Sequence, residues 1–410
     1  MSNTGGRTTV LTVETQLLDD IRPLVPLVDP RHPLVFTRRG QGIAGIGEAL
    51  RLEFHGPDRM TQAAATWKAI AAAAQVTDPL QRPGTGLVAF GAFAFSDVSS
   101  ATSVLIVPSV IIGRRDGVSW ITRINSDAAL PPATPIGPEF RITLVPGTLT
   151  AEGYVAAVNS AVQRIRSHDL SKVVLARDLV GRLPAGGDLR LVLAGLSLGY
   201  PDCYTFAVDG LIGSSPETLV RADHGTVSAR VLAGSTARGA DALADQEAAV
   251  GLATSTKDQD EHQYALQSLL QSLRPHARNV TTSELPFTLK LPNLWHLASD
   301  VEGTLTDGAT SLDLIAALHP TAAVAGTPTT LALSLISELE PFDRGRYAGP
   351  VGWVGADGDG EWAVALRSAE VAEDGTITAY AGAGILGDSD AEKELAETKM
   401  KFRPIVEAFS

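Results

Sequence analysis

The stretch 204–232, YTFAVDGLIGSSPETLVRADHGTVSARVL, decides the fold class of this chain. Three segments in it, 204–208, 218–222 and 226–232, are rich in β-branched and other apolar residues and lie between turn-forming residues, as strands do. The tripeptide Asp223-His224-Gly225 predicts a hairpin turn between the last two strands. Strands that follow one another without an intervening helix predict an α+β fold with large antiparallel sheets, and they argue against a doubly wound parallel sheet.

The sequence on both sides of this stretch contains further strand and helix patterns. Apolar residues recur at three- and four-residue spacing after Thr150, which predicts a capped helix over 151–167. The full set of expected elements comprises helices at 59–75, 151–167, 241–273, 311–318 and 391–408, and strands at 10–13, 87–90, 172–183, 293–301, 347–354, 361–371 and 376–381. We expect the last three strands to form an antiparallel meander.

The distribution of proline and glycine suggests how the chain is organised. Residues 1–145 are strand-rich but less regular than the rest, and the segment 128–138 carries four prolines, which is typical of a linker. We expect residues 1–145 to form the N-terminal, strand-rich part of a single fold. Residues 146–410 contain the motifs that carry chemistry.

Composition limits the classes of partner. The 410 residues include 33 Lys and Arg against 46 Asp and Glu, a formal net charge of −13. An acidic chain is a poor ligand for nucleic acid or an anionic membrane, and no apolar run reaches the roughly 18 residues that a membrane span needs. The single cysteine, Cys203, excludes an intramolecular disulfide framework, and the polar N-terminus does not resemble a signal peptide. We therefore expect a cytoplasmic protein without a nucleic-acid or membrane partner.

Two pairs of carboxylates stand three residues apart in predicted helices, so that each pair shares one helix face. The pairs are Asp258 with Glu261 and Glu394 with Glu397. Carboxylates at this spacing repel one another, and a hard divalent cation such as Mg²⁺ would offset the repulsion. The alternative is two solvated helix faces whose acids are neutralised by neighbouring lysines, namely Lys257, Lys393 and Lys401.

Lys172 and Glu217 are candidate acid–base groups. Lys172 begins the apolar segment 172–176, and an inward side chain would be desolvated and become a candidate base. The alternative is a lysine that reaches solvent at a strand edge. Glu217 follows Pro216 at a strand entrance, where a surface position is the ordinary outcome.

Three further features place polar groups in apolar surroundings. Gly382-Ala383-Gly384 ends a predicted strand, where glycines allow either close approach of an anion to backbone amides or a plain tight turn. Arg367 has apolar neighbours in a predicted strand and requires a carboxylate, from the protein or from a ligand. His296 and His319 are each consistent with hydrogen-bonded structural histidines.

Together these motifs resemble the chorismate-utilising enzymes, a family that includes isochorismate, salicylate, anthranilate and aminodeoxychorismate synthases. The resemblance covers roughly residues 150–408, and it depends on the joint order and spacing of blocks that are weak singly. The blocks are SKVVLAR (171–177), SPE (215–217), LAGS (232–235) followed by RG (238–239), KD (257–258) with EH (261–262), HPTAAV (319–324), YAG (347–349), GDGEW (358–362), ALR (365–367), AGAG (381–384) and ELAET (394–398).

The resemblance implies two large packed antiparallel sheets wrapped by helices, with a chorismate-binding catalytic region in residues 146–410 and the site between the sheets. It implies Lys172 as the general base that activates water and Glu217 as the general acid that protonates the departing hydroxyl. Burial would favour the neutral amine and the protonated carboxyl, which are the opposed states that this reaction requires. It also implies Mg²⁺ as cofactor, with Asp258 close to the three metal ligands, which are Glu261, Glu394 and Glu397.

The resemblance further implies the groups that bind chorismate. Tyr347 and Arg367 match a clamp on the enolpyruvyl carboxylate. The amides around Gly382 and Gly384, together with Lys401, match contacts to the ring carboxylate.

A loop at Gly234 and Ser235 matches one that lines the substrate ring, where the family more often has threonine in place of the serine. His296 and His319 match site histidines without an assigned role. Salicylate synthases, which go on to expel pyruvate, tend to carry threonine where this chain has Ala323.

Two features favour the isochorismate synthases within this family. The strand lysine matches enzymes that add water rather than ammonia, and both the alanine at 323 and the GDGEW block are similar to those of isochorismate synthases. We therefore expect a monomeric isochorismate synthase that serves menaquinone biosynthesis. A salicylate synthase, a synthase for catecholate siderophores and an inactive paralogue are the alternatives.

Overall fold

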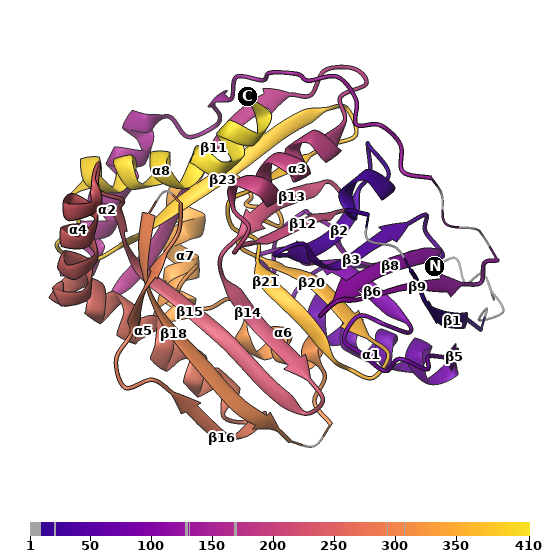
Figure 1. The fold of residues 1–410 in the computed structure, drawn as a ribbon. Coiled ribbons are helices and arrows are strands. Elements are labelled where there is room, and N and C mark those ends of the chain that lie inside the picture. Colours follow the sequence, from indigo (N-terminus) through magenta and orange to yellow (C-terminus); the bar gives the residue numbers. More distant parts are fainter. Residues whose placement is uncertain are drawn as a thin grey trace, which may run out of the picture.

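Two large β-sheets dominate the computed structural model, which describes residues 10–19, 22–127, 130, 132–167, 170–292, 294–306 and 308–410. The sheets lie face to face and helices surround them (Figure 1). Within the described residues the strand pairings are antiparallel, apart from one parallel pair at the edge of the larger sheet. The expected fold class, α+β with two large antiparallel sheets wrapped by helices, is confirmed.

The larger sheet combines strands from both ends of the chain. In spatial order it contains β10 (Val145–Pro146), β11 (Lys172–Arg182), β23 (Thr376–Ile385), β22 (Ser368–Val371), β13 (Leu211–Ser215), β12 (Tyr204–Val208), β2 (Leu34–Arg38), β3 (Gln41–Ile46), β8 (Val110–Arg115), β9 (Val118–Ile124), β1 (Thr12–Leu17) and β5 (Gln75–Thr77), with β19 (Gly326–Thr327) against β11. The parallel pair is β1 with β5.

The smaller sheet is also shared between the N-terminal and C-terminal parts of the chain. In spatial order it contains β16 (Ala277–Thr282), β18 (Leu294–Leu305), β15 (Thr226–Ala237), β14 (Thr218–Asp223), β21 (Gly360–Val364), β20 (Pro350–Gly355), β6 (Val88–Ala92), β7 (Ser103–Val107) and β4 (Leu50–Phe54), with β17 (Phe287–Lys290) against β18. The described strands before residue 145 therefore extend both sheets. The division of the chain at residue 145 stays a prediction.

The helices divide between the two sheets. Those that pack against the larger sheet are α2 (Ala151–Arg166), α3 (Leu189–Gly199), α7 (Thr329–Leu339) and α8 (Ala391–Phe409). Those that pack against the smaller sheet are α4 (Ala242–Thr254), α5 (Thr256–Leu273) and α6 (Ser311–Leu318), and α1 (Arg59–Ala73) packs on α6 and β4. A short 3-10 helix, Val25–Leu27, lies against α3.

Apolar side chains form two layers. One layer includes residues of both sheets, such as Val173 of β11 and Trp362 of β21, so it joins the sheets into one body. The other lies between the larger sheet and the helices α3 and α8, where Leu193 and Phe402 pack with Ile377. The site described below lies where strands of both sheets reach the first layer.

Most predicted elements are present. Thr150 caps α2 by accepting a hydrogen bond from the Gly153 amide, and α6 occupies the predicted residues 311–318. The hairpin turn at 223–225 joins β14 to β15. The expected linker at 128–138 lies partly outside the described residues, and its described part contains neither helix nor strand.

Two predictions of element order are wrong. The single helix expected at 241–273 is two helices, because Ser255 ends α4 and caps α5 by accepting a hydrogen bond from the Asp258 amide. The expected meander is divided between the sheets: β20 and β21 pair in the smaller sheet, and β22 and β23 pair in the larger one. The chain passes from one sheet to the other at residues 365–367, so the strand predicted over 361–371 is interrupted there. The prediction also missed α3 and α7.

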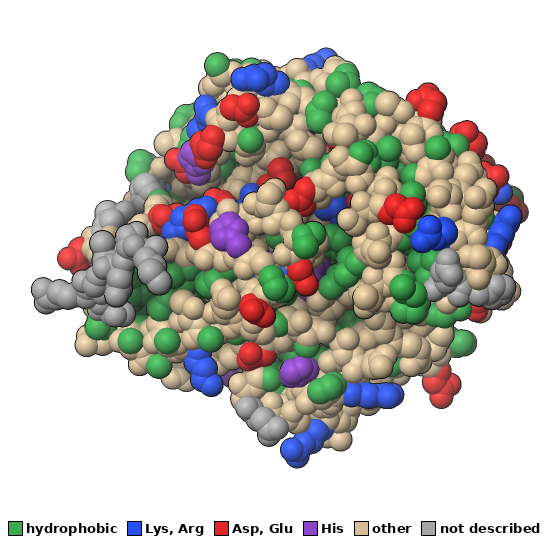
Figure 2. Space-filling model, turned by 180° about the vertical axis from the view of Figure 1, so that it is seen from behind, with side chains coloured by type: hydrophobic (Ala, Val, Ile, Leu, Met, Phe, Trp, Pro, Cys, Tyr) green, Lys and Arg blue, Asp and Glu red, His purple; other side chains and the backbone are tan. Residues whose placement is uncertain are grey.

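The surface carries charges of both signs. On the face shown in Figure 2, acidic and basic side chains are interspersed rather than gathered by sign. Within the part of the chain that the structure describes, no helix is both long enough and apolar enough to cross a membrane.

Candidate active site

A partly enclosed pocket lies where the two sheets face one another. Its walls come from β11 and β23 of the larger sheet, β15 and β18 of the smaller sheet, and helices α5 and α8. The predicted site residues that line it are Glu217, Gly234, Ser235, Glu261, His296, Ala323, Tyr347, Arg367, Gly382, Gly384 and Lys401. The fold thus gathers groups from distant parts of the sequence into one concave site, as small-molecule sites require.

Lys172 is buried at the start of β11, beside this pocket. Its Nζ lies 3.0 Å from Glu261 Oε1, at ion-pair distance. A Cβ on Gly384 would lie 2.5 Å from Glu261 Oε1 and 2.9 Å from Lys172 Cε, so a larger residue there would displace the ends of both side chains. The alternative of a lysine that reaches solvent at a strand edge is excluded.

Glu217 lies in the connection between β13 and β14, directly after Pro216, and only 5% of its surface is exposed. Burial raises the pKa of its carboxyl to about 8, against the opposing effect of nearby cations, which are Lys172, Lys401 and Arg367. The carboxyl is therefore mainly protonated at neutral pH and can donate a proton into the pocket.

Each of the three predicted metal ligands faces a lysine. The nitrogen-to-oxygen distances are 3.0 Å for Lys172 and Glu261, 3.2 Å for Lys257 and Glu394, and 2.6 Å for Lys401 and Glu397. These acids lie on α5 and α8, and only Glu261 among them lines the pocket directly. The sequence analysis named Lys257, Lys393 and Lys401 as lysines that could neutralise these acids. Lys257 and Lys401 do form such ion pairs.

The acids of the two helices are close enough to influence one another. Burial, reinforced by Glu397, raises the pKa of Glu394. Burial also raises the pKa of Asp258, with contributions from Glu261 and Glu397. Burial would raise the pKa of Glu261 as well, but Lys172 and two further lysines outweigh it and hold that pKa below its ordinary value.

These carboxylates fit a divalent cation by donor type, because Mg²⁺ prefers oxygen ligands from a small number of carboxylates. Their ligand oxygens, however, do not all lie within 4.8 Å of one another. Among the described residues, the group that meets this condition is Asp223, His224 and Asp359, whose members already hydrogen-bond one another at a hairpin turn. One cation bound by all three predicted ligands therefore requires their carboxylates to move closer together.

Arg367 lies at the point where the chain passes between the sheets, and only 6% of its surface is exposed. Its Nη2 donates a hydrogen bond to His296 Nε2 at 3.2 Å. Burial lowers the pKa of its guanidinium, and no carboxylate of the described residues lies within the ion-pair distance of 4.0 Å. A buried guanidinium needs an anionic partner, so this pocket is built for an anionic ligand.

His296 and Tyr347 flank this guanidinium. Burial, reinforced by Arg367, lowers the pKa of His296 well below its ordinary value, so the neutral ring accepts the hydrogen bond and orients the arginine. The Tyr347 ring stacks on Tyr380 with a centroid distance of 5.3 Å, and burial raises the pKa of its hydroxyl to about 12. The phenol therefore stays protonated and can donate a hydrogen bond.

The glycines of β23 lie within the strand rather than at its end, contrary to the prediction. Gly382 pairs with Ala176 of β11, and Gly384 pairs with Val174. Lys401 Nζ donates to the Gly382 carbonyl oxygen at 3.1 Å, which fixes the lysine beside the pocket. The small size of these residues keeps the pocket floor open.

The loop predicted to line the ring is an irregularity in β15. Gly234 has φ 79°, and the register of β15 against β18 shifts between Leu232 and Ser235. A Cβ on Gly234 would lie 3.0 Å from Asp258 Cβ, so β15 approaches α5 closely at this position. Ser235 Oγ donates to Glu397 Oε1 at 3.1 Å, which links the loop to the acids of α8.

His319 does not reach the pocket, in contrast to Ala323, which lines it. The His319 Nε2 donates to the Phe95 carbonyl oxygen at 2.9 Å, and burial lowers the pKa of the ring to about 4. His319 is therefore a hydrogen-bonded structural histidine, which is one of the two possibilities that the sequence analysis gave for it.

Arg344 and Tyr380 also line the pocket, and the sequence analysis missed them. Arg344 is buried, forms a 2.6 Å ion pair with Glu340, and donates to the carbonyl oxygens of Val174 and Val324. The segment 342–350, FDRGRYAGP, contains two arginines just before a predicted site tyrosine, and that was the available signal.

Comparisons with known proteins show what this chain is similar to. A family model described as chorismate binding enzyme matches residues 8–129 and 136–410. Isochorismate synthase DhbC of Bacillus subtilis strain 168 is 41% identical over 269 residues, which are 63% of this chain and 67% of that protein. Isochorismate synthase EntC of Escherichia coli K12 is 36% identical over 270 residues, 65% of this chain and 68% of that protein.

The likeness extends to solved structures. MenF, the menaquinone-specific isochorismate synthase from Escherichia coli, superimposes with a TM-score of 0.77 over 97% of this chain and 94% of that chain. The sequence identity is 24%, so this similarity concerns the fold.

We predict that Gly384→Ala will destabilise the protein by about 1–3 kcal/mol, because the added methyl overpacks the Lys172–Glu261 pair. Chemical denaturation followed by fluorescence measures the change. Gly387→Ala is the matched control, since a Cβ there meets its nearest neighbour, Ile165, at an ordinary 3.4 Å. Equal stability of the two variants would contradict the crowding at Gly384.

Proposed function

Since this chain belongs to the chorismate-binding enzyme family, we propose that it is an isochorismate synthase. The reaction is the isomerisation of chorismate to isochorismate, by addition of water at C2 and loss of the hydroxyl at C4. The observation that carries the proposal is a buried lysine and a buried, mainly protonated glutamate, Lys172 and Glu217, at one pocket. A water-adding isomerase needs these two groups in opposite roles.

Chorismate carries two carboxylates, and the pocket offers cations for them although the whole chain is acidic. We assign Arg367 and Tyr347 to the enolpyruvyl carboxylate, because the guanidinium has no carboxylate partner among the described residues. We assign Lys401 and the backbone at Gly382 and Gly384 to the ring carboxylate. Both sets of residues line the same pocket.

In the proposed mechanism Lys172 takes a proton from water as the water attacks C2, and Glu217 gives its proton to the leaving hydroxyl at C4. The raised pKa of Glu217 keeps that proton available at neutral pH. For Lys172 to accept a proton its amine must be neutral at that moment, so its contact with Glu261 has to give way. Burial of both groups excludes bulk water and makes each proton transfer directional.

We propose Mg²⁺ as the cofactor, held by Glu261, Glu394 and Glu397 with Asp258 nearby. When bound, the cation would neutralise the ring carboxylate of the substrate. These carboxylates now face Lys172, Lys257 and Lys401.

The wall of the pocket at Ala323 supports a reaction that ends at isochorismate. Expulsion of pyruvate requires the enolpyruvyl side chain to fold over the ring so that the C2 hydrogen reaches it. A methyl group at this wall offers no hydroxyl to favour that conformer. The menaquinone role, the cytoplasmic location and the monomeric state expected from the sequence stay predictions.

The acid–base assignment predicts large and specific losses of rate. Lys172→Ala and Glu217→Gln should each lower kcat by about 10²- to 10⁴-fold, the usual contribution of a general base or acid. Lys393→Ala, which removes an exposed lysine of α8, is the control and should leave kcat unchanged.

In the wild type, kcat/KM should fall as pH rises through about 8, because Glu217 then loses its proton. A pH profile of kcat/KM measures this fall. If Glu217→Gln shows the same fall at the same pH, the titration belongs to another group.

The metal assignment predicts that excess chelator abolishes turnover and that added Mg²⁺ restores it. Glu261→Gln or Glu394→Gln should remove most activity, because each takes one charge from the cation site. Glu392→Gln is the matched control, since Glu392 is exposed on the same helix. Steady-state assays in metal-free buffer test the metal assignment. Full turnover in that buffer would contradict a requirement for Mg²⁺.

The product assignment predicts that wild type accumulates isochorismate in near balance with chorismate and releases little pyruvate. Ala323→Thr should raise pyruvate release, because small steric and hydrogen-bonding differences in a pocket wall shift preferences by about 1–3 kcal/mol. Coupled lactate dehydrogenase detection of pyruvate is the measurement. Stoichiometric pyruvate from the wild type would make the protein a salicylate synthase.

A further inference from the structure

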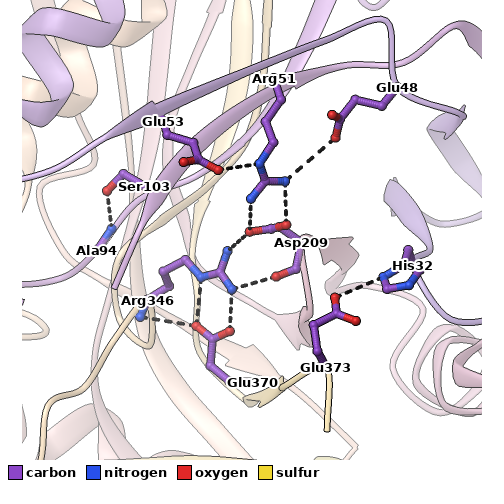
Figure 3. A network of polar contacts seen from close by, with 10 residues as sticks. All are labelled: His32, Glu48, Arg51, Glu53, Ala94, Ser103, Asp209, Arg346, Glu370 and Glu373. Carbon is purple, nitrogen blue, oxygen red and sulfur yellow. Dashed lines mark hydrogen bonds and ion pairs between the residues drawn. The ribbon is translucent and has the colours of Figure 1, made fainter. Parts of the chain in front are cut away.

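A network of charged side chains, drawn in Figure 3, lies outside the residues that line the pocket. Its centre is Arg346, whose Nε and Nη2 donate to Glu370 at 3.0 and 2.7 Å. Arg346 Nη1 donates to Asp209 Oδ2 at 2.9 Å, and its Nη2 also donates to the Asp209 carbonyl oxygen at 2.6 Å. Arg51 approaches Asp209 from the other side, with contacts of 2.7 and 3.1 Å.

The network joins four separate segments of the chain. Arg51 lies on β4, Asp209 in the turn between β12 and β13, and Glu370 on β22, and Arg346 precedes β20. Arg346 is the immediate neighbour of Tyr347, and Glu370 follows Arg367 by three residues. None of the four charged residues lines the active-site pocket, so the network acts on the pocket through the backbone that it holds.

That backbone has an unusual conformation at two positions. Ala348 has φ 63° and Arg367 has φ 50°, in the left-handed region that residues with a side chain rarely adopt. Residues persist there only when surrounding contacts over-determine them, and such residues concentrate at functional sites. Hydrogen bonds from the Ala348 amide to Ala365 O and from the Ser214 amide to Arg367 O supply part of that constraint.

We propose that Arg346, Glu370 and Asp209 are positioning residues that hold Tyr347 and Arg367 in place for the enolpyruvyl carboxylate. The bidentate contact between Arg346 and Glu370 ties the segment before β20 to β22, and thereby fixes the spacing of the two assigned side chains. Asp209 anchors both to the β12–β13 turn. This inference rests on the proposed function for the identity of the anion, but not for the constraint on the backbone.

The test compares Arg346→Met with wild type in steady-state kinetics on chorismate. Arg346→Met keeps an apolar side chain of similar length and removes the guanidinium group, which donates two hydrogen bonds to Glu370. We expect KM to rise about tenfold or more while kcat changes much less, because misplacement by about 1 Å is enough to cost up to 100-fold and the lost interaction is one of binding. Arg346→Lys, which keeps the charge without the guanidinium group, should recover only part of the affinity.

Two controls separate positioning from general loss of stability. Arg51→Met leaves the Arg346–Glu370 contact intact and should give a KM close to wild type. Arg190→Met removes a comparably buried arginine, paired with Asp188 at 2.7 Å elsewhere in the fold, and should lower the melting temperature without raising KM. If Arg346→Met does not fold, Glu370→Gln tests the same contact.

The outcomes are distinct. An unchanged KM in Arg346→Met or Glu370→Gln, or an equal rise in Arg190→Met, would overturn the positioning role. If wild type itself neither binds nor converts chorismate, the proposed function fails, and a crystal structure of Arg346→Met then decides this inference. Departure of Ala348 and Arg367 from positive φ would support it, and retention of both conformations would overturn it.

Discussion

The pairing of β11 with β23 is the constraint on which the rest of the site depends. It runs from Val173 opposite Ile385 to Arg182 opposite Thr376, and it joins segments that are about 200 residues apart in sequence. Because the ladder is in this register, Gly384 stands beside the side chain of Lys172, and there is room for its ion pair with Glu261. Helix α8 packs on β23 and brings Lys401 and the paired glutamates to the same edge. A slip of β11 by one residue would turn the side chain of Lys172 to the other face of the sheet.

The sequence was a good guide wherever a local pattern determined the outcome. The fold class, the capped helix α2 and the burial of Lys172 all followed from periodicity or from the resemblance that the motifs carry. Two outcomes depended on long-range contacts that no local pattern encodes. The strand expected across Arg367 is broken because its two halves pair in different sheets. His319 matched a site histidine by motif, yet its partner is the Phe95 carbonyl, more than 200 residues away.

The missed pocket residues show a second limit. Arg344 and Tyr380 reach the pocket only through tertiary packing, and Arg344 is satisfied by Glu340 and two carbonyl groups rather than by a ligand. The predicted metal ligands show a different case, because the acid pairs lie on helices as expected and each predicted ligand meets a lysine. Spacing along a helix predicts which face a carboxylate occupies, whereas its partner can come from any neighbouring element. Lys172 lies on β11, Lys257 on α5 and Lys401 on α8.

The way the N-terminal strands are inserted into both sheets bears on how this protein can change over evolution. Strand β2 pairs directly with β12, and β6 pairs directly with β20, so the N-terminal third supplies neighbours to strands that stand close to the pocket. Without those neighbours, β12 and β20 would each present an open row of backbone donors and acceptors to other chains. The catalytic motifs are therefore not a portable module. Recombination that separates the first 145 residues from the remainder would break two sheets at once.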